Sequence, residues 1–135
     1  MQMQIVQTIL AHYPQTQAVY LFGSFAAGQE GADSDVDIAL LLPPQKAKEA
    51  GTLALTPLHL SLAEQLGREV DLINLRLVSS VFQKEIIIQG QRIFCADMFA
   101  ADEFEMLTLS FYQKLNEERR EILVEFARTG RAYPV

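Results

Sequence analysis

Residues 21–42, LFGSFAAGQEGADSDVDIALLL, decide the fold of this 135-residue chain. A short apolar segment ends at Gly23 and Ser24, a glycine-rich loop follows, and an apolar strand is predicted over 35–42. Successive side chains of a strand point to opposite faces, so Asp35 and Asp37 leave the same face. The other face carries the apolar side chains of Val36, Ile38, Leu40 and Leu42. We therefore expect a strand with one apolar face and two neighbouring carboxylates.

A third carboxylate, Asp71, lies in the middle of a second predicted strand, EVDLINL at 69–75. Carboxylates placed close together repel one another, and a cation relieves that cost. Mg²⁺ is a hard cation that prefers oxygen ligands. If the two strands are neighbours, Asp35, Asp37 and Asp71 converge. They could then hold two Mg²⁺ ions about 3.5–4 Å apart, the arrangement used for in-line displacement at phosphorus.

The turn after the first strand predicts a phosphate-binding site. A glycine at position 23 lets the backbone approach a phosphate closely, and the Ser24 hydroxyl can donate to phosphate oxygens. The loop is not a P-loop, because no lysine follows its glycines, and its spacing does not match the dinucleotide-binding fingerprint. The sequence thus predicts a phosphate-binding turn beside a metal-binding site.

Composition limits the classes of function. Half of the residues are hydrophobic, which is enough for one core without a disulfide or a structural metal. The net charge is −6, which argues against direct nucleic-acid binding. Cys95 is the single cysteine, the N-terminus has no secretory signal, and no apolar run is long enough to cross a membrane. We expect a cytoplasmic protein with no membrane association.

The periodicity of apolar residues predicts an α/β (α+β) protein in which helices pack on a small β-sheet. Strands are expected at 17–23, 35–42, 69–75 and 91–95. Helices are expected at 2–13, at 45–67 with a break at Pro57, and at about 77–89. Thr56 should cap the helix that begins at Pro57, and Gly67 should end it. His12, His59 and Cys95 are interpreted as packing or surface residues rather than catalysts.

A long helix is predicted over about 102–129, with Asp102 and Glu105 at the spacing of a capping box. One apolar stripe, expected to pack on the core, contains Phe104, Leu107, Phe111, Leu115, Ile122 and Phe126. A second stripe, Met106, Leu109, Tyr112 and Leu123, indicates a surface for a partner. We accordingly divide a single domain into a core, 1–97, and a C-terminal helical extension, 98–135, that packs on the core and on a partner.

The stretch at 21–42 resembles the signature of the DNA-polymerase-β-type nucleotidyltransferase superfamily. The whole chain, including EVDLINL and the helical segment SFYQKLNEERREIL, is most similar to the minimal nucleotidyltransferases, the MNT antitoxins encoded beside HEPN-domain toxins. The resemblance implies a polymerase-β-like fold, in which helices pack on a small mixed β-sheet and a long helix lies at the C-terminus. It also implies transfer of AMP from ATP to a tyrosine of the HEPN toxin, which blocks the toxin's RNase activity.

The same resemblance implies roles for individual residues. Asp35 and Asp37 would bind both Mg²⁺ ions, and Asp71 would complete one metal site and help deprotonate the attacking hydroxyl. Gly23 and Ser24 would hold the triphosphate of ATP, and Ser34 would orient the loop or a phosphate.

This sequence departs from the superfamily in the loop. Many members carry arginine where Phe25 and Ala27 stand here, and the change removes a bidentate phosphate clamp. Two alternatives therefore stay open beside the adenylyltransferase antitoxin. One is a binding antitoxin that occludes its toxin with little turnover, and the other is a small-molecule nucleotidyltransferase of the kind that inactivates antibiotics.

Overall fold

The computed structural model describes residues 2–23 and 35–129, with side chains as far as Ile122. Within these residues, four strands form one sheet: β1 (Ala18–Phe22), β2 (Val36–Leu41), β3 (Val70–Asn74) and β4 (Gln91–Cys95). The sheet order is β3-β2-β1-β4. Strand β1 pairs antiparallel with β2 and with β4, whereas β2 and β3 are parallel. The expected mixed sheet is confirmed, and each strand lies within one residue of its expected bounds.

The helices before the last strand are α1 (Gln2–His12), α3 (Pro44–Ala50), α4 (Pro57–Leu66) and α5 (Ser80–Gln89). The Thr56 hydroxyl accepts from the backbone N–H of His59, and Gly67 ends α4 with a left-handed φ of 63°. Both signals were predicted. The expected start of α5 at about 77 was early, because a 3₁₀ turn (Leu75–Leu77) comes first and the Ser79 hydroxyl then caps the helix.

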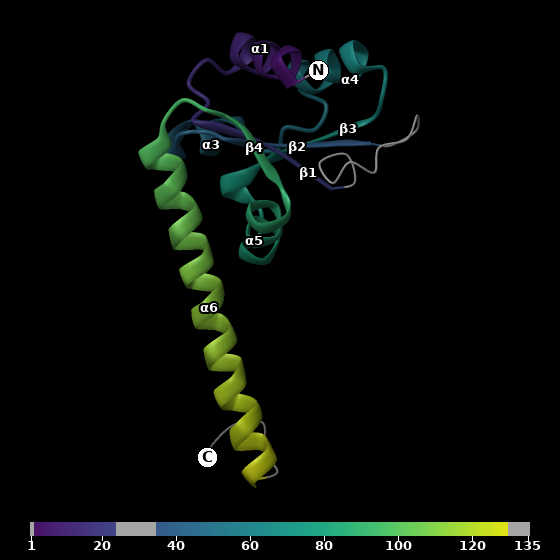
Figure 1. The fold of residues 1–135 in the computed structure, drawn as a ribbon. Helices are drawn as coiled ribbons and strands as arrows, with labels where there is room; N and C mark the ends of the chain where they lie inside the picture. The colour runs from purple at the N-terminus through teal and green to yellow at the C-terminus, as the bar shows by residue number, and fades with distance from the viewer. Residues whose placement is uncertain (1, 24–34, 130–135) are drawn as a thin grey trace.

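Helices cover both faces of the sheet (Figure 1). Ile5 and Ile9 of α1 and Leu58 and Leu62 of α4 pack on one face in a first apolar cluster. The second cluster, on the other face, includes Tyr20, Ala39, Leu41, Leu75 and Ile86. Strand β2 is therefore buried on both sides over most of its length. Within β2 only Asp37 is partly exposed, and Asp35, just before the strand, is exposed. None of the described helices is both long and apolar enough to span a membrane.

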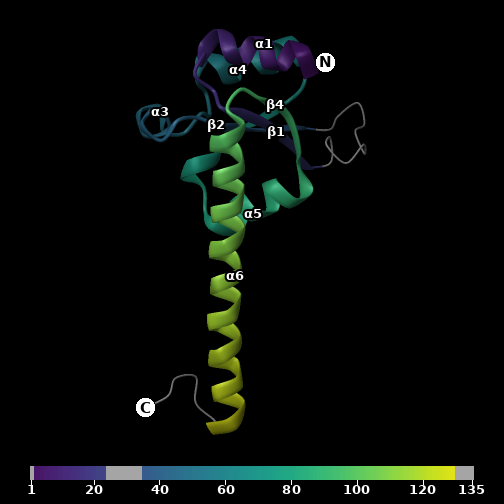
Figure 2. The same cartoon turned by 60° about the vertical axis from the view of Figure 1, so that its left-hand side comes forward.

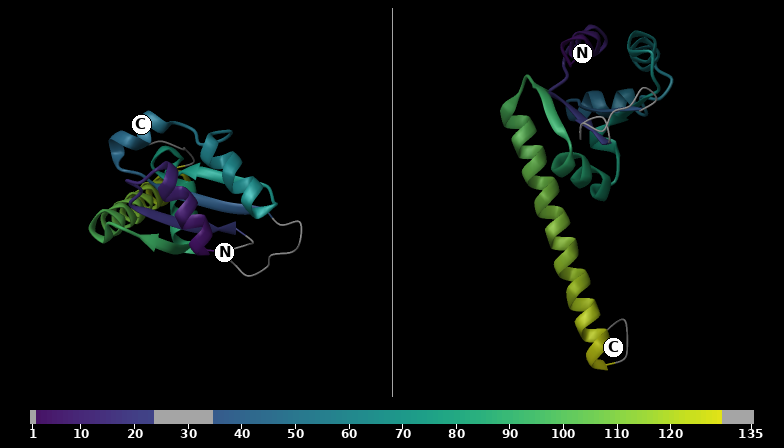
Figure 3. Two further views of the ribbon diagram at one scale, coloured as in Figure 1. Left: turned by 90° about the horizontal axis from the view of Figure 1, so that it is seen from above. Right: turned by 45° about the vertical axis from the view of Figure 1, so that its right-hand side comes forward.

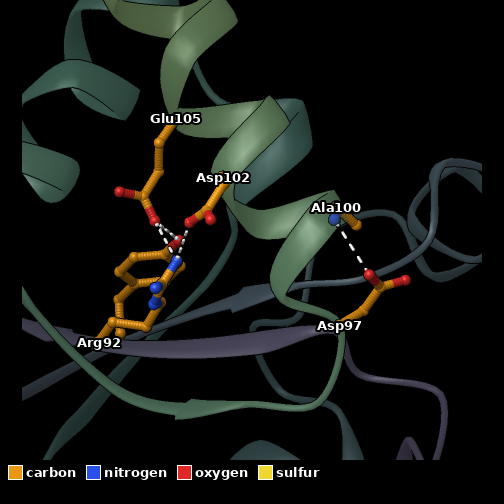
Figure 4. A network of polar contacts seen from close by, with 6 residues as sticks. Arg92, Asp97, Ala100, Asp102 and Glu105 are labelled. Carbon is orange, nitrogen blue, oxygen red and sulfur yellow. Dashed lines mark hydrogen bonds and ion pairs between the residues drawn. The ribbon is translucent and has the colours of Figure 1, made fainter.

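The last helix, α6 (Met98–Thr129), begins four residues earlier than expected. Asp97 caps it, because its Oδ1 accepts a 3.0 Å hydrogen bond from the backbone N–H of Ala100 (Figure 4). The predicted capping box of Asp102 and Glu105 was wrong, since both residues lie inside the helix. Their carboxylates instead bind Arg92 of β4, at 3.1 and 2.8 Å.

Helix α6 packs mainly on α5 and then projects away from the sheet (Figures 1 and 2). Its 32 residues span roughly 48 Å at about 1.5 Å per residue. A view from another side shows the same projection (Figure 3). The second half of the helix therefore lies beyond the part of the molecule that could cover it.

The expected division of apolar stripes on α6 was partly wrong. The residues that turn toward the core are Ala101 and Thr108, which are buried, with Phe104 beside them. Two residues of the first stripe, Leu107 and Phe111, are 59% and 52% exposed. Ala101 packs in the second cluster with residues of β1, β2 and α5, whereas the adjacent apolar flank stays free.

Candidate active site

Asp37 and Asp71 occupy the same register position in the adjacent parallel strands β2 and β3. Parallel neighbours in register point their side chains to the same face of a sheet. Val70 and Leu72, on either side of Asp71, are buried in the first apolar cluster, so Asp71 points to the opposite face and is exposed. The strand pairing on which the predicted site depends is thus present.

Asp35 lies just before β2, and its charge acts on Asp37. Burial raises the pKa of the Asp37 carboxyl above its ordinary value, and the carboxylates of Asp71 and then Asp35 raise it further. The negative charges of Asp35 and Asp71 therefore both act on the Asp37 carboxyl, as expected for like charges at the same end of two neighbouring strands.

The donor set fits Mg²⁺ in its chemistry, because three carboxylates supply only oxygen ligands. Across residues 2–23 and 35–129, however, no three His, Cys, Asp or Glu side chains are already gathered closely enough to enclose an ion. Like charges favour rotamers that hold carboxylates apart, and a cation between them reverses that preference. The strand register nevertheless fixes the backbone of Asp37 beside that of Asp71.

Gly23 follows β1 and lies directly against the Asp37 carboxylate. A Cβ added at Gly23 would lie 2.1 Å from Oδ2 of Asp37, and the residue has a left-handed φ of 75°. The positive φ favours glycine here, and an added Cβ would also force the Asp37 carboxylate to move. The other predicted phosphate-binding residues, Ser24 and Ser34, lie outside the described residues, as do Phe25 and Ala27.

Phe22 anchors the end of β1 next to the site. It pairs with Asp37 across the β1–β2 ladder, and its ring meets Phe82 of α5 edge to face, with centroids 5.7 Å apart. The sequence analysis missed Phe82, because one aromatic residue in an amphipathic helix gives no sign of which strand it will touch. The contact of Phe82 with Phe22 joins α5 to the end of the strands that carries the carboxylates.

The histidine interpretation agrees with the contacts of His59. Its Nδ1 accepts a 2.7 Å hydrogen bond from the backbone N–H of Leu55, so its Nε2 carries the proton. That nitrogen lies 2.7 Å from the carbonyl oxygen of Val70 and donates to it. His59 therefore holds α4 against the start of β3, which is a structural role.

Comparisons with known proteins relate this chain to nucleotidyltransferases. The family model described as polymerase beta, nucleotidyltransferase matches residues 4–99. The chain is 34% identical over 121 residues to a protein adenylyltransferase MntA of Shewanella oneidensis, covering 89% of this chain and 83% of that protein.

Two solved structures are similar over nearly the full length. One is a toxin–antitoxin crystal structure with AMP-PNP, where the matching chain is 30% identical with a TM-score of 0.71, covering 93% of this chain and 98% of that one. The other is a tri-AMPylated Shewanella oneidensis HEPN toxin in complex with MNT antitoxin. Its matching chain is 30% identical with a TM-score of 0.63, covering 93% and 95%.

Proposed function

The chain belongs to the polymerase beta nucleotidyltransferase family, and from this premise we propose that it is an antitoxin that transfers AMP from ATP to a tyrosine of a cognate HEPN-domain RNase toxin. A relative of 34% identity is named a protein adenylyltransferase, and a similar solved complex contains an AMPylated HEPN toxin. The observation that carries the proposal is the register of Asp37 with Asp71 beside Gly23.

The proposed reaction is an in-line displacement at the α-phosphorus of ATP. The tyrosine oxygen forms a bond to that phosphorus, the bond to the bridging oxygen breaks, and pyrophosphate leaves. Two Mg²⁺ ions, when bound, would neutralise the triphosphate and promote ionisation of the attacking hydroxyl. Asp35 and Asp37 would hold both ions, and Asp71 would complete one site and help take the proton from the tyrosine.

The glycine at position 23 has a defined role in this proposal. Its lack of a side chain lets the backbone run directly past the Asp37 carboxylate, so a triphosphate held there lies next to the metal ligands. Ser24 would add a hydroxyl donor to the phosphate, and Ser34 would orient the loop. Phe25 and Ala27, in place of the usual arginines, predict weaker nucleotide binding than in relatives that keep the clamp.

We propose that the toxin docks on the exposed apolar flank of α6, defined here as Leu107, Phe111 and Ile122. These side chains are 59%, 52% and 41% exposed, and they follow one side of a helix that extends past the core. Large apolar side chains gathered on one exposed surface favour a protein partner. The core, 1–97, would then carry the chemistry, and the extension, 98–135, would bring the toxin to it in the cytoplasm.

The same surface supports the second candidate, a binding antitoxin that neutralises its toxin by occlusion. The loop without arginine favours low turnover, whereas the docking flank is independent of the carboxylates. The two functions differ in whether neutralisation needs Asp35 and Asp37.

The experiment combines the purified protein with labelled ATP, Mg²⁺ and the product of the adjacent toxin gene. We expect label on a toxin tyrosine and loss of RNase activity. The double variant Asp35→Asn with Asp37→Asn should abolish labelling. Glu49→Gln on α3, which removes an exposed carboxylate at the other end of β2, is the matched control and should label normally.

Two outcomes count against adenylyl transfer. One is the absence of label on every tyrosine of a toxin that binds the protein. The other is full protection of cells by the double aspartate variant, which would favour occlusion.

A further inference from the structure

Gly90, where α5 ends and β4 is about to begin, packs against the end of β1 too closely to carry a side chain. A Cβ added there would lie 2.3 Å from the carbonyl oxygen of Ile86 and 2.9 Å from that of Leu21. It would also lie 3.3 Å from the Cβ of Phe22. The backbone φ is −85°, a value open to any residue, so lack of space rather than conformation requires glycine.

The atoms that Gly90 meets belong mainly to backbone. A flexible side chain could turn away from an added methyl group, but the carbonyl oxygens of Ile86 and Leu21 move only with their main chain. The backbone N–H of Gly90 also donates a 2.8 Å hydrogen bond to the Ile86 carbonyl, which closes the end of α5. An alanine at this position must therefore push the end of α5 and the end of β1 apart.

A second residue of α5, Phe82, contacts the same end of β1. The Phe82 ring, one turn before Ile86 in α5, meets the Phe22 ring at an interplanar angle of 80°. The backbone N–H of Phe82 donates to the Ser79 hydroxyl at 3.2 Å, which fixes the first turn of the helix. Gly90 and Phe82 thus contact Leu21 and Phe22 from both ends of one helix.

Gly23 directly follows β1, so a displacement of Leu21 and Phe22 reaches the site through Gly23. Phe22 is the register partner of Asp37, and Gly23 lies so close to Asp37 Oδ2 that no Cβ fits between them. A shift of Leu21 and Phe22 changes the spacing between the Gly23 backbone and the Asp37 carboxylate. In the proposed site, this is the spacing between the backbone that would bind the phosphates and a carboxylate that would bind the metal.

We propose that Gly90 and Phe82 are positioning residues for nucleotidyl transfer, which set the distance of the Gly23 backbone from the Asp37 carboxylate. The inference rests on the proposed function. Neither residue touches the reacting atoms; both act through the end of β1. Displacing reacting groups by about 1 Å can cost on the order of 100-fold in rate. The inference therefore predicts a large kinetic effect from a small change outside the site.

The test compares Gly90→Ala with Gly51→Ala. Gly51 has a left-handed φ of 62°, and an added Cβ there would meet nothing within 4 Å. It ends α3, beyond the other end of β2, so its alanine variant loses stability through strain without disturbing β1. Both variants are measured at a temperature where circular dichroism shows them fully folded. Calorimetry with AMP-PNP and Mg²⁺ gives nucleotide affinity, and toxin labelling gives kcat and KM.

We expect Gly90→Ala to weaken nucleotide binding roughly tenfold or more and to lower kcat as well. Gly51→Ala should leave both values unchanged despite its lower melting temperature. Phe82→Leu, which keeps an apolar side chain but removes the ring pair, should raise KM to a smaller extent. Phe82→Ala should have the larger effect of the two.

Wild-type values of affinity and kcat in a folded Gly90→Ala protein would overturn the inference. An equal loss in Gly51→Ala would also overturn it, because the effect would then follow stability alone. If Gly90→Ala does not fold, the Phe82 pair decides: unchanged kinetics in folded Phe82→Ala overturn the proposal. Failure of the wild type to bind AMP-PNP would instead reject the proposed function, and this inference with it.

Discussion

The hydroxyl of Tyr20 donates a 2.7 Å hydrogen bond to the carboxylate of Glu105, which joins the central strand to the long helix. Arg92 donates to the same carboxylate oxygen at 2.8 Å and to Asp102 at 3.1 Å. Tyr20 is 2% exposed, so its hydroxyl has little access to water. These hydrogen bonds among four side chains hold the first turns of α6 in place on the sheet.

Tyr20→Phe should destabilise the protein by about 1–2 kcal/mol, because it removes a hydrogen bond to a charged group and leaves the carboxylate with one donor fewer. Urea denaturation at neutral pH measures the change. Tyr13→Phe is the matched control, because Tyr13 packs in the first apolar cluster on the other face of the sheet. An equal loss in both variants would contradict the assignment.

The pH dependence of stability should also change in Tyr20→Phe. Burial raises the pKa of the Tyr20 hydroxyl above its ordinary value of 10.0, and the Glu105 carboxylate raises it further. A group whose pKa is higher in the folded state contributes stability that is complete below its unfolded pKa and is lost as the pH rises. The wild type should therefore lose stability above about pH 10 faster than Tyr20→Phe does. Parallel curves would contradict the prediction.

Gly23→Ala should weaken nucleotide binding, because the new methyl group would displace the Asp37 carboxylate and strain the left-handed backbone. Gly51→Ala, also at a positive φ, should cost only strain of about 1–3 kcal/mol and keep nucleotide binding. Calorimetry with AMP-PNP and Mg²⁺ separates the two variants. Normal affinity in Gly23→Ala would show that the backbone at this position does not hold the phosphates.

Asp37→Asn should raise the melting temperature measured in EDTA, since it removes one of three carboxylates that repel each other. Millimolar Mg²⁺ should stabilise the wild type, because ligands that bind only the folded state add to its stability. The same Mg²⁺ should have little effect on the variant. A wild-type melting temperature that ignores Mg²⁺, with or without nucleotide, would argue against the metal site.

Replacing Leu107 and Phe111 together by serine should weaken the toxin complex on the order of tenfold or more, because exposed apolar anchors often dominate binding energy. The isolated protein should keep its melting temperature, since both side chains are more than half exposed. Serine at Met3 of α1, an exposed apolar residue on the opposite side of the sheet, is the control for general loss of apolar surface. Unchanged affinity in the double variant would place the toxin elsewhere.

Local signals in the sequence were enough for most of the elements. Alternating side chains in DVDIALLL predicted the carboxylates and the apolar face of β2. Thr56 before Pro57 predicted the start of α4, and Gly67 predicted its end. These features depend on residues a few positions apart, whose geometry is set by backbone dihedral angles and short-range hydrogen bonds. Alternation with core residues also predicted that Asp37 and Asp71 each point away from the apolar core, whereas the pairing of their strands was only a condition that the structure meets.

The failures concern choices between partners distant in the chain. Asp102 and Glu105 had the spacing of a capping box, but Arg92 competed for both carboxylates and Asp97 took the capping position. The free flank of α6 could not be distinguished from its packed flank by periodicity, since the flank that packs is decided by contacts with the sheet and α5.

The sequence by itself determined the strands, both ends of α4 and the face on which Asp37 and Asp71 lie, because these follow from local backbone geometry and side-chain alternation. The tertiary structure alone decided that Gly90 presses on the end of β1, that Phe82 meets Phe22, and that Tyr20 bonds Glu105. Phe82 and Phe22 are 60 positions apart in the chain, and Tyr20 and Glu105 are 85 positions apart. Such pairs form only when packing of the whole chain brings their elements together.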